Sequence, residues 1–113
     1  MDFSTVVAIV NQENEDMAID IAKANGAGGV TILNGRGLGL GDKTTFFGIS
    51  YERSDAVLIF VVEKHIVLKV IKAITHELDL GKSGSGLVFS LPIENLHGIP
   101  DKQLRKFEEN LQS

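Results

Sequence analysis

Residues 55–62 read DAVLIFVV, a run of β-branched and other apolar residues that predicts a buried strand. After this run, apolar residues recur at helical spacing and predict one stripe of an amphipathic helix: Ile66, Val67, Val70, Ile71, Ile74 and Leu78. A Gly/Ser loop over 81–86 leads to a further strand over 87–91, which Pro92 ends. The second half of the chain is therefore predicted to run strand, helix, strand.

The first third of the chain repeats this order. Residues 3–10, FSTVVAIV, predict a buried strand, and Asn11 offers a side-chain oxygen to start a helix with an acidic first turn. Gly26 is expected to end that helix, and residues 30–33 form the next strand. Two such units predict an α+β fold, the ferredoxin-like βαββαβ sandwich.

The remainder of the chain predicts one more element. After Pro100, apolar residues recur at helical spacing and predict a short C-terminal helix over 101–112. A chain of 113 residues has the usual size of one domain. We therefore expect a single domain over 1–113, with its core over about residues 3–99.

The composition excludes several classes of protein. Fifteen acidic against 11 basic residues give a net charge of −4, which argues against nucleic acid or an anionic membrane surface as a partner. The absence of cysteine excludes disulfides, thiolate zinc sites and a Cys nucleophile. No apolar run approaches the roughly 20 residues of a membrane span, and the first residues lack the basic segment of a signal peptide. We expect a cytoplasmic protein with no direct membrane insertion.

The strands also predict what surrounds the sheet. VVAIV and VLIFVV are apolar without alternation, which is typical of strands covered on both faces, yet two helices cover only one face of this fold. Either the C-terminal helix folds back over the second face or other subunits cover it. The tail offers little apolar surface, so we favour an oligomer.

Most of the 12 glycines lie in two clusters. In the first, from Gly35 to Gly41, the spacing fails the G-x-G-x-x-G dinucleotide pattern, and no helix follows. In the second, Gly81-Lys82-Ser83 resembles the end of a Walker A motif, but His76 stands where its first glycine belongs. Both standard nucleotide fingerprints are therefore excluded.

The second cluster, GKSGSG, has two interpretations that the sequence leaves open. Glycines allow successive backbone N–H groups to converge on an anion, while Lys82 and the hydroxyls of Ser83 and Ser85 would add charge and donors. The same segment is also an ordinary flexible turn between a helix and a strand, and such turns are common.

The connection from Leu38 to Ser54 is 17 residues long, more than a hairpin needs. It carries several large apolar side chains, namely Phe46, Phe47, Ile49 and Tyr51. They either pack against the body of the domain or insert into a partner protein.

Catalytic and metal-binding sets are poorly represented. The three histidines, His65, His76 and His97, fall in different elements, and Glu94 has no evident carboxylate partner. We therefore expect no catalytic site, no metal site and no enzyme.

One segment carries a resemblance to a known family. GKSGSGLVFSLPIENLHGI, residues 81–99, is similar to the glycine-rich B-loop, fourth strand and Pro-x-Glu of the P-II nitrogen regulatory proteins. Gly35 and Gly37 lie where that family begins its T-loop, and Thr31 lies on the strand before it. The resemblance covers residues 3–99. It implies a homotrimer with inward-facing sheets, an adenine nucleotide (ATP, ADP or AMP) between subunits, and a T-loop that docks on a regulated transporter or metabolic enzyme.

The candidate ligand-binding residues come from the two glycine clusters and the strand before the first: Thr31, Gly35, Arg36, Gly37, Gly81, Lys82, Ser83, Gly84, Ser85 and Gly86. The loop residues expected to reach a partner are Phe46, Phe47 and Tyr51.

The chain departs from the family at positions that hold phosphates. Leu87 replaces a basic residue, Gly98 and Pro100 replace two arginines, and Leu38-Gly39 replaces an Arg-Gln pair. A triphosphate would lose several charge-assisted bonds of about 1.5–3 kcal/mol each. We therefore expect a divergent P-II-like regulator that recognises a different nucleotide or a small anion. The alternative is a ferredoxin-like trimeric module that binds an amino acid or a divalent metal.

Overall fold

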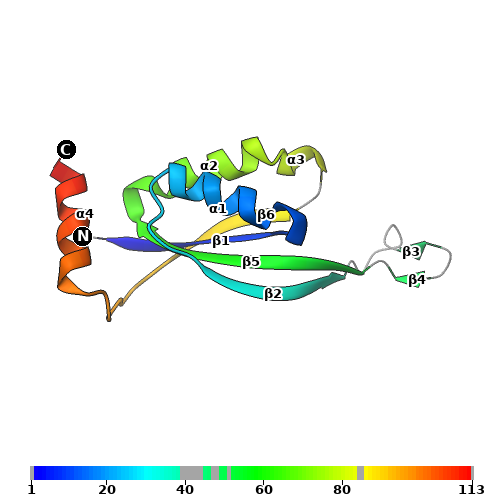
Figure 1. Cartoon of the computed structure of the whole chain (residues 1–113), viewed down its shortest axis with the longest axis horizontal. Coiled ribbons are helices and arrows are strands. Elements are labelled where there is room, and N and C mark those ends of the chain that lie inside the picture. Colours follow the sequence, from blue (N-terminus) through cyan, green and yellow to red (C-terminus); the bar gives the residue numbers. More distant parts are fainter. Residues whose placement is uncertain (1, 39–44, 47–48, 51, 84–85, 113) are drawn as a thin grey trace.

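The computed structural model describes residues 2–38, 45–46, 49–50, 52–83 and 86–112. Its centre is a four-stranded antiparallel sheet in the order β2-β5-β1-β6 (Figure 1). The four strands are β1 (Phe3–Asn11), β2 (Thr31–Leu38), β5 (Glu52–Glu63) and β6 (Gly86–Pro92). Two short strands, β3 (Thr45–Phe46) and β4 (Ile49–Ser50), pair with each other beyond the end of the sheet.

Two helices, α1 (Glu15–Ala24) and α2 (Val67–Glu77), cover one face of the sheet, and the 3-10 turns η1 (Gln12–Asn14) and η3 (Lys64–Ile66) precede them. The short helix α3 (Leu80–Ser83) follows α2, and α4 (Asp101–Gln112) is at the C-terminal end. Figure 1 shows α1 and α2 on the same side of the sheet, packed against each other, and α4 beyond the end of the sheet at which β1 begins. This order of strands and helices is the predicted ferredoxin-like α+β sandwich, with the predicted short helix at the C-terminal end.

Two of the strands are longer than the apolar pattern predicts. The hydrogen-bonded pairing of β2 with β5 runs from Thr31 opposite Ile59 to Leu38 opposite Glu52. Backbone pairing carries β2 through Gly35 and Gly37, because the ladder needs only N–H and C=O groups. The expected 38–54 connection therefore begins as a two-stranded ribbon.

The predicted start of the first helix is wrong, whereas its predicted end is confirmed. Asn11 is the last residue of β1, its side chain caps no helix, and η1 separates it from α1. At the other end, Gly26 follows the helix with φ +108°, a left-handed conformation that glycine adopts without steric cost.

The core lies between the sheet and the two helices. Even-numbered side chains of β1 and β5 point to it, since strand side chains alternate between faces. The largest fully buried ones are Val6, Val10, Leu58, Phe60, Val62, Val70 and Ile74. The predicted stripe of α2 is confirmed, because Val67, Val70 and Ile74 are buried and Ile66 and Ile71 pack against them.

The opposite face of the sheet, here called the open face, is apolar and accessible in the single chain. It carries the odd-numbered residues of β1, β5, β6 and β2, among them Thr5, Val7, Ile9, Val57, Ile59, Val61, Leu87, Phe89, Leu91 and Leu33. Leu33, Leu87 and Leu91 are each 51% exposed and Phe89 is 38% exposed. Figure 1 places α4 beyond the strand ends, not across this face. The prediction that the C-terminal helix folds back across this face is therefore wrong, and other subunits stay the predicted cover.

We predict that Phe60→Ala destabilises the protein by about 3–5 kcal/mol, because Phe60 is 1% exposed and truncation leaves a cavity between sheet and helices. Urea unfolding at one fixed protein concentration measures the change. Met17→Ala is the control, since Met17 is 54% exposed and its loss is expected to stay within about 0.5 kcal/mol. Equal losses in both variants would contradict the position of the core.

Candidate functional site

The first glycine cluster faces a pair of polar residues at one end of the sheet. Asn11 of β1 is opposite Asp55 of β5, and Asp55 is in turn opposite Gly35 of β2. One row further in, Val10 is opposite Gly86 of β6. The two glycine clusters thus lie at the same end of the sheet but on opposite edges, about 14 Å apart across three strand spacings. Asn11 and Asp55 lie on the two strands between them.

Asp55 is a buried carboxylate at the root of the long loop. The residue is 5% exposed, and Arg53 Nε lies 3.2 Å from its Oδ1. A Cβ at Gly37 would collide with the Asp55 carboxylate and would lie 3.0 Å from Arg53 Nε. Gly37 is therefore a glycine because these two side chains occupy the space beside it.

Two oxygen atoms in this row lack a hydrogen-bond donor among the described residues. They are Asn11 Oδ1 and Asp55 Oδ1, both fully shielded from solvent. The contact of Asp55 with Arg53 is close enough for an ion pair but lacks hydrogen-bond geometry. Buried acceptors without donors are rare and require an explanation, such as water, an ion or a ligand. The row therefore presents two shielded acceptor oxygens without a donor among the described residues.

The second glycine cluster begins as a helical turn. Gly81, Lys82 and Ser83 belong to α3, with Lys82 exposed to solvent. Gly86 opens β6, where an added Cβ would collide with the carbonyl oxygen of Ile9 and lie 3.1 Å from Val10 Cα. Gly84 and Ser85 lie outside the described residues, so the predicted anion nest remains a prediction. The glycine at position 86 is explained by strand packing.

The remaining candidates of the first cluster are spread along β2. Arg36 is exposed and opposite Ser54. Thr31 is opposite Ile59, about 13 Å along the strand from Gly35. Thr31 is therefore apart from the glycine end of the sheet.

Thr31 borders a hollow of about 220 Å³ on the open face. Its other lining residues are mostly apolar and come from β5, from the segment after β6 and from the first turn of α4: Ile59, Val61, Leu96, Ile99 and Gln103. Gly28, Gly29 and Val30 form its remaining wall. We call this space the open-face hollow.

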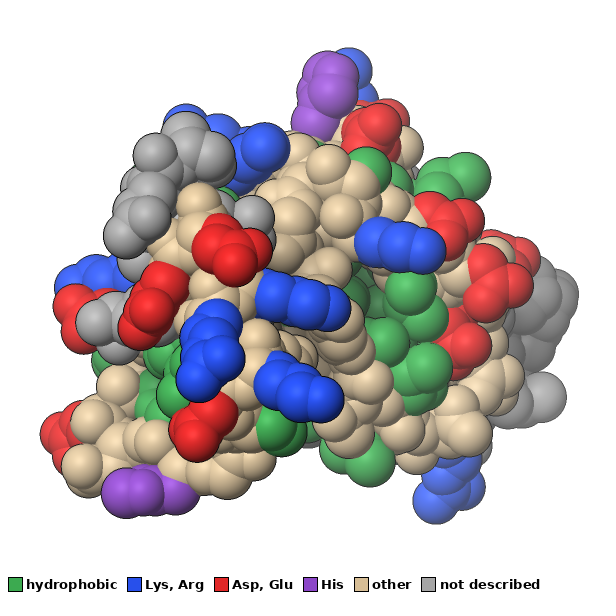
Figure 2. All heavy atoms as spheres, turned by 60° about the vertical axis from the view of Figure 1, so that its left-hand side comes forward, with side chains coloured by type: hydrophobic (Ala, Val, Ile, Leu, Met, Phe, Trp, Pro, Cys, Tyr) green, Lys and Arg blue, Asp and Glu red, His purple; other side chains and the backbone are tan. Residues whose placement is uncertain are grey.

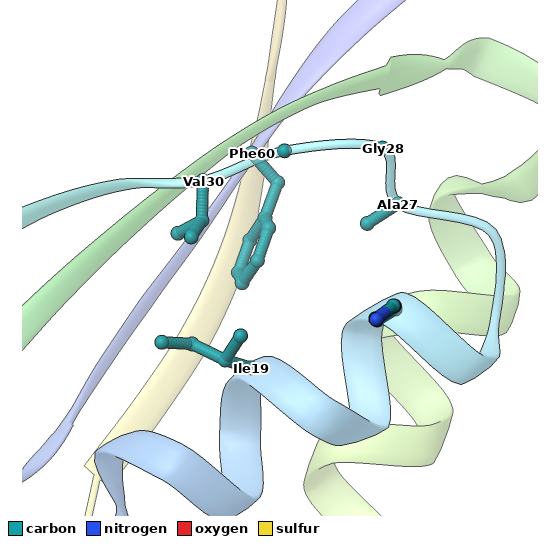
Figure 3. A pocket seen from close by; sticks show the side chains of 7 residues that line it. Ile19, Ala27, Gly28, Val30 and Phe60 are labelled. Carbon is teal, nitrogen blue, oxygen red and sulfur yellow. The ribbon is translucent and has the colours of Figure 1, made fainter.

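A second hollow, of about 250 Å³, lies on the helix side of the same segment (Figure 3). Phe60 and Val30 point toward Ile19 of α1, and Ala27 and Gly28 complete the rim that Figure 3 shows. Residues 28–30 line both hollows. The segment before β2 is therefore a thin wall between two cavities.

The predicted partner loop is only partly described. Phe46 belongs to β3, whereas Phe47 and Tyr51 lie outside the described residues. Whether the aromatic side chains pack or reach a partner stays a prediction.

Charged groups elsewhere form no further cluster in the part of the chain that the structure describes. His65 Nδ1 lies 3.2 Å from Glu63 Oε2, and no group of three potential metal ligands occurs among the described residues. Figure 2 looks from the α4 end and shows Lys and Arg interspersed with Asp and Glu, with apolar side chains gathered in the right half. None of the described helices is long and apolar enough to cross a membrane.

Sequence reasoning missed the two features that shape this region. The Gly28-Gly29 pair, directly before β2, was a signal for a close approach of backbone. Asp55, the only charge in DAVLIFVV, was a signal for a polar group at the end of a buried strand. Neither signal by itself indicates that Asn11 and Asp55 face each other.

The comparisons with known proteins agree with this fold. The family model described as nitrogen regulatory protein P-II matches residues 3–102. A comparison with curated protein sequences gave no match.

Two solved structures are similar to the chain. The B. subtilis GlnK-ATP complex has a TM-score of 0.68 and 22% sequence identity, covering 84% of this chain and 87% of that chain. CPII, a nitrogen regulatory PII-like protein from Thiomonas intermedia K12 bound to ADP, AMP and bicarbonate, has a TM-score of 0.65 and 18% identity, covering 88% and 98%. At these identities the similarity shows a shared fold.

We predict that Gly86→Ala costs about 1–3 kcal/mol of stability, because its methyl group would push against the backbone of β1. Gly35→Ala is the matched control, since a Cβ there meets nothing within 4 Å, and its effect is expected within about 0.5 kcal/mol. Thermal and urea unfolding compare the two. If Gly86→Ala were as stable as Gly35→Ala, strand packing would not explain the glycine at position 86, and a role in ligand binding would be its remaining explanation.

Proposed function

The chain belongs to the nitrogen regulatory protein P-II family, and from this membership we propose that it is a cytoplasmic, non-enzymatic signalling regulator. It assembles as a homotrimer and binds an adenine nucleotide or a small anionic ligand between subunits. Ligand binding then controls a regulated protein, such as a transporter or metabolic enzyme, through the loop between β2 and β5. The observation that carries the proposal is the family match over residues 3–102.

The open face supports the proposed trimer. Apolar patches that stay exposed on a single chain commonly mark an interface. Leu87, Phe89 and Leu91 extend along one edge strand of this face, and Leu33 extends along the other. Three copies that turn these faces inward would bury them and give the apolar strands their second cover.

The open-face hollow and the glycine end suggest how a nucleotide would lie. The hollow is mainly apolar, with Thr31 and Gln103 as polar groups, and such a lining suits a planar base. From there, phosphates would run along β2 toward Gly35, Arg36 and Gly37. Lys82 and the residues around it, Gly81 to Gly86, would approach the phosphates from the other edge of the sheet. The similar structures support this ligand class, since their reported complexes contain ATP, or ADP and AMP.

The β2–β5 ribbon gives the proposed partner loop its base. The ribbon lies beside the proposed phosphate site, so a ligand there would contact the two strands that flank the loop in sequence, in which Phe46, Phe47 and Tyr51 are expected to reach a partner. A regulator needs no chemical step at this site, because a change in ribbon position suffices to alter docking.

We predict that the wild-type protein has the mass of a trimer in light scattering, and that Phe89→Lys combined with Leu91→Lys reduces it to a monomer. Two lysines on the open face would place unpaired charges in an apolar interface. Leu68→Lys is the control, because Leu68 is 66% exposed but lies on α2, away from this face. A monomeric wild-type protein would refute the trimer.

We predict that at least one of AMP, ADP, ATP or a cyclic dinucleotide binds in calorimetric titrations, and that Lys82→Ala weakens this binding about two- to tenfold. The loss is modest because Lys82 is exposed to solvent. Lys72→Ala, which removes another exposed lysine, on α2, is expected to bind nucleotide like the wild type. If no nucleotide binds while amino acids or divalent cations do, the nucleotide proposal fails and the alternative module replaces it.

A further inference from the structure

The hollow of about 250 Å³ between α1 and residues 27–30 is here called the helix-side hollow. We propose that it binds a small monocarboxylate with a branched apolar body. All of its lining residues belong to one chain, and it lies on the opposite side of the sheet from the open face. The proposal therefore goes beyond the proposed function, whose nucleotide lies between subunits.

The walls of the helix-side hollow are mainly apolar. Ile19 of α1 and Val30 face each other across it, the ring of Phe60 projects between them, and Ala27 lies at the rim (Figure 3). Phe60 is 1% exposed, so its ring forms the inner wall. The volume of about 250 Å³ exceeds that of a cavity of roughly 150 Å³ that takes benzene, and it is below the roughly 300 Å³ of the smallest drug-sized pockets. The occupant is therefore a small molecule with an apolar body.

Lys23 brings a positive charge to this hollow. It lies four residues after Ile19 on α1, and residues at this spacing share one face of a helix. The carbon stem of a lysine can lie along an apolar wall while its ammonium stays in water. Lys23 is exposed and forms no ion pair among the described residues. Asp20, one turn earlier on α1, is exposed and is not part of the lining. The charge of Lys23 is therefore available to an anionic ligand.

Two glycines in the wall of the hollow support a ligand beside them. Gly28 and Gly29 do not have a φ in the left-handed region, whereas Gly26 just before them has φ +108°. An added Cβ at Gly28 or Gly29 would meet no atom within 4 Å. Neither backbone conformation nor packing within the chain requires glycine at these positions, although glycine lowers stability through its backbone entropy. Both line both hollows, so a side chain at either would take up space beside a bound molecule.

These features together select a monocarboxylate. An apolar body displaces water from the apolar walls, and a carboxylate accepts a charge-assisted hydrogen bond from the Lys23 ammonium. A second carboxylate would lie against apolar side chains without a partner, which disfavours dicarboxylates. An α-amino acid would place its own ammonium near that of Lys23, where like charges repel. Isocaproate, a branched hydrocarbon chain with one carboxylate, has the required composition.

Titration of isocaproate into the wild-type protein, followed by NMR of the isoleucine methyl groups, tests the site. Ile19 lines the helix-side hollow and Ile59 lines the open-face hollow, so their methyl groups report on the two spaces separately. The Ile19 resonance is expected to shift with a dissociation constant of about 1 mM or lower, while the Ile59 resonance stays in place. A shift at Ile59 without one at Ile19, or no shift at Ile19 up to about 10 mM, overturns the proposal without any variant.

Isocaproamide, the neutral amide of the same shape, tests the role of Lys23. The wild type is expected to bind isocaproate about three- to tenfold more tightly than the amide, a modest preference because Lys23 is exposed to water. This preference is expected to disappear in Lys23→Gln and to persist in Lys69→Gln, which removes an exposed lysine from α2. Equal binding of acid and amide by the wild type overturns the proposal, as does a preference that survives in Lys23→Gln.

Leucine has the branched body and carboxylate of isocaproate together with an ammonium. It is expected to bind at least about threefold more weakly. Tighter binding of leucine would make the hollow an amino-acid site and overturn the proposed ligand class.

Ile19→Trp fills the hollow from α1 and is expected to abolish isocaproate binding. Ile19 is only partly buried, so the variant is expected to fold, and circular dichroism checks this. Unchanged isocaproate affinity in the folded variant overturns the proposal. Nucleotide titrations decide the proposed function independently, so the two proposals fail separately.

Discussion

The antiparallel register between β1 and β5 is the constraint on which the rest of the structure depends. Phe3 pairs with Glu63 at one end and Asn11 pairs with Asp55 at the other. This register directs Val6, Val10, Leu58 and other even-numbered side chains toward the helices. A slip of one residue would turn every one of them to the open face and replace the core with the alternate set. Both faces are apolar, so the polar ends of the two strands contribute to fixing the register.

The polar residues at one of these strand ends, Asn11 and Asp55, lower the stability of the fold, because each has a buried oxygen without a donor among the described residues. Asp55 Oδ1 and Asn11 Oδ1 are shielded from solvent and lack a donor among the described residues, and a hydrophobic pair would hold the same register at a lower cost in stability. Arg53, whose Nε lies 3.2 Å from Asp55 Oδ1, offsets part of the carboxylate charge. Natural sequences depart from local consistency mostly at functional sites, so this pair is better explained by a function at this end of the sheet than by stability.

The predictable part of the fold is the part that apolar periodicity determines. The strand over 55–62 and the stripe of α2 follow from β-branched content and helical spacing, because burial of those side chains dominates the local choice. The extension of β2 through Gly35 and Gly37 was not predictable, since it depends on a partner strand distant in sequence. Asn11 was misassigned as a helix cap for a related reason. Local capping preference favours that role, but pairing with Asp55 retains the residue in β1.

Gly37 lies where the proposed ligand site meets the base of the loop between β2 and β5. The Asp55 carboxylate and Arg53 fill the space that a side chain at position 37 would need, so the backbone of β2 and these two side chains pack as one unit. An anion that drew Arg53 away from Asp55 would change the packing against Gly37, which lies one residue before the end of β2. The long loop leaves the sheet at that point. Asp55 therefore packs beside the base of the loop, and a ligand that displaced its carboxylate would act on the loop without any intervening element.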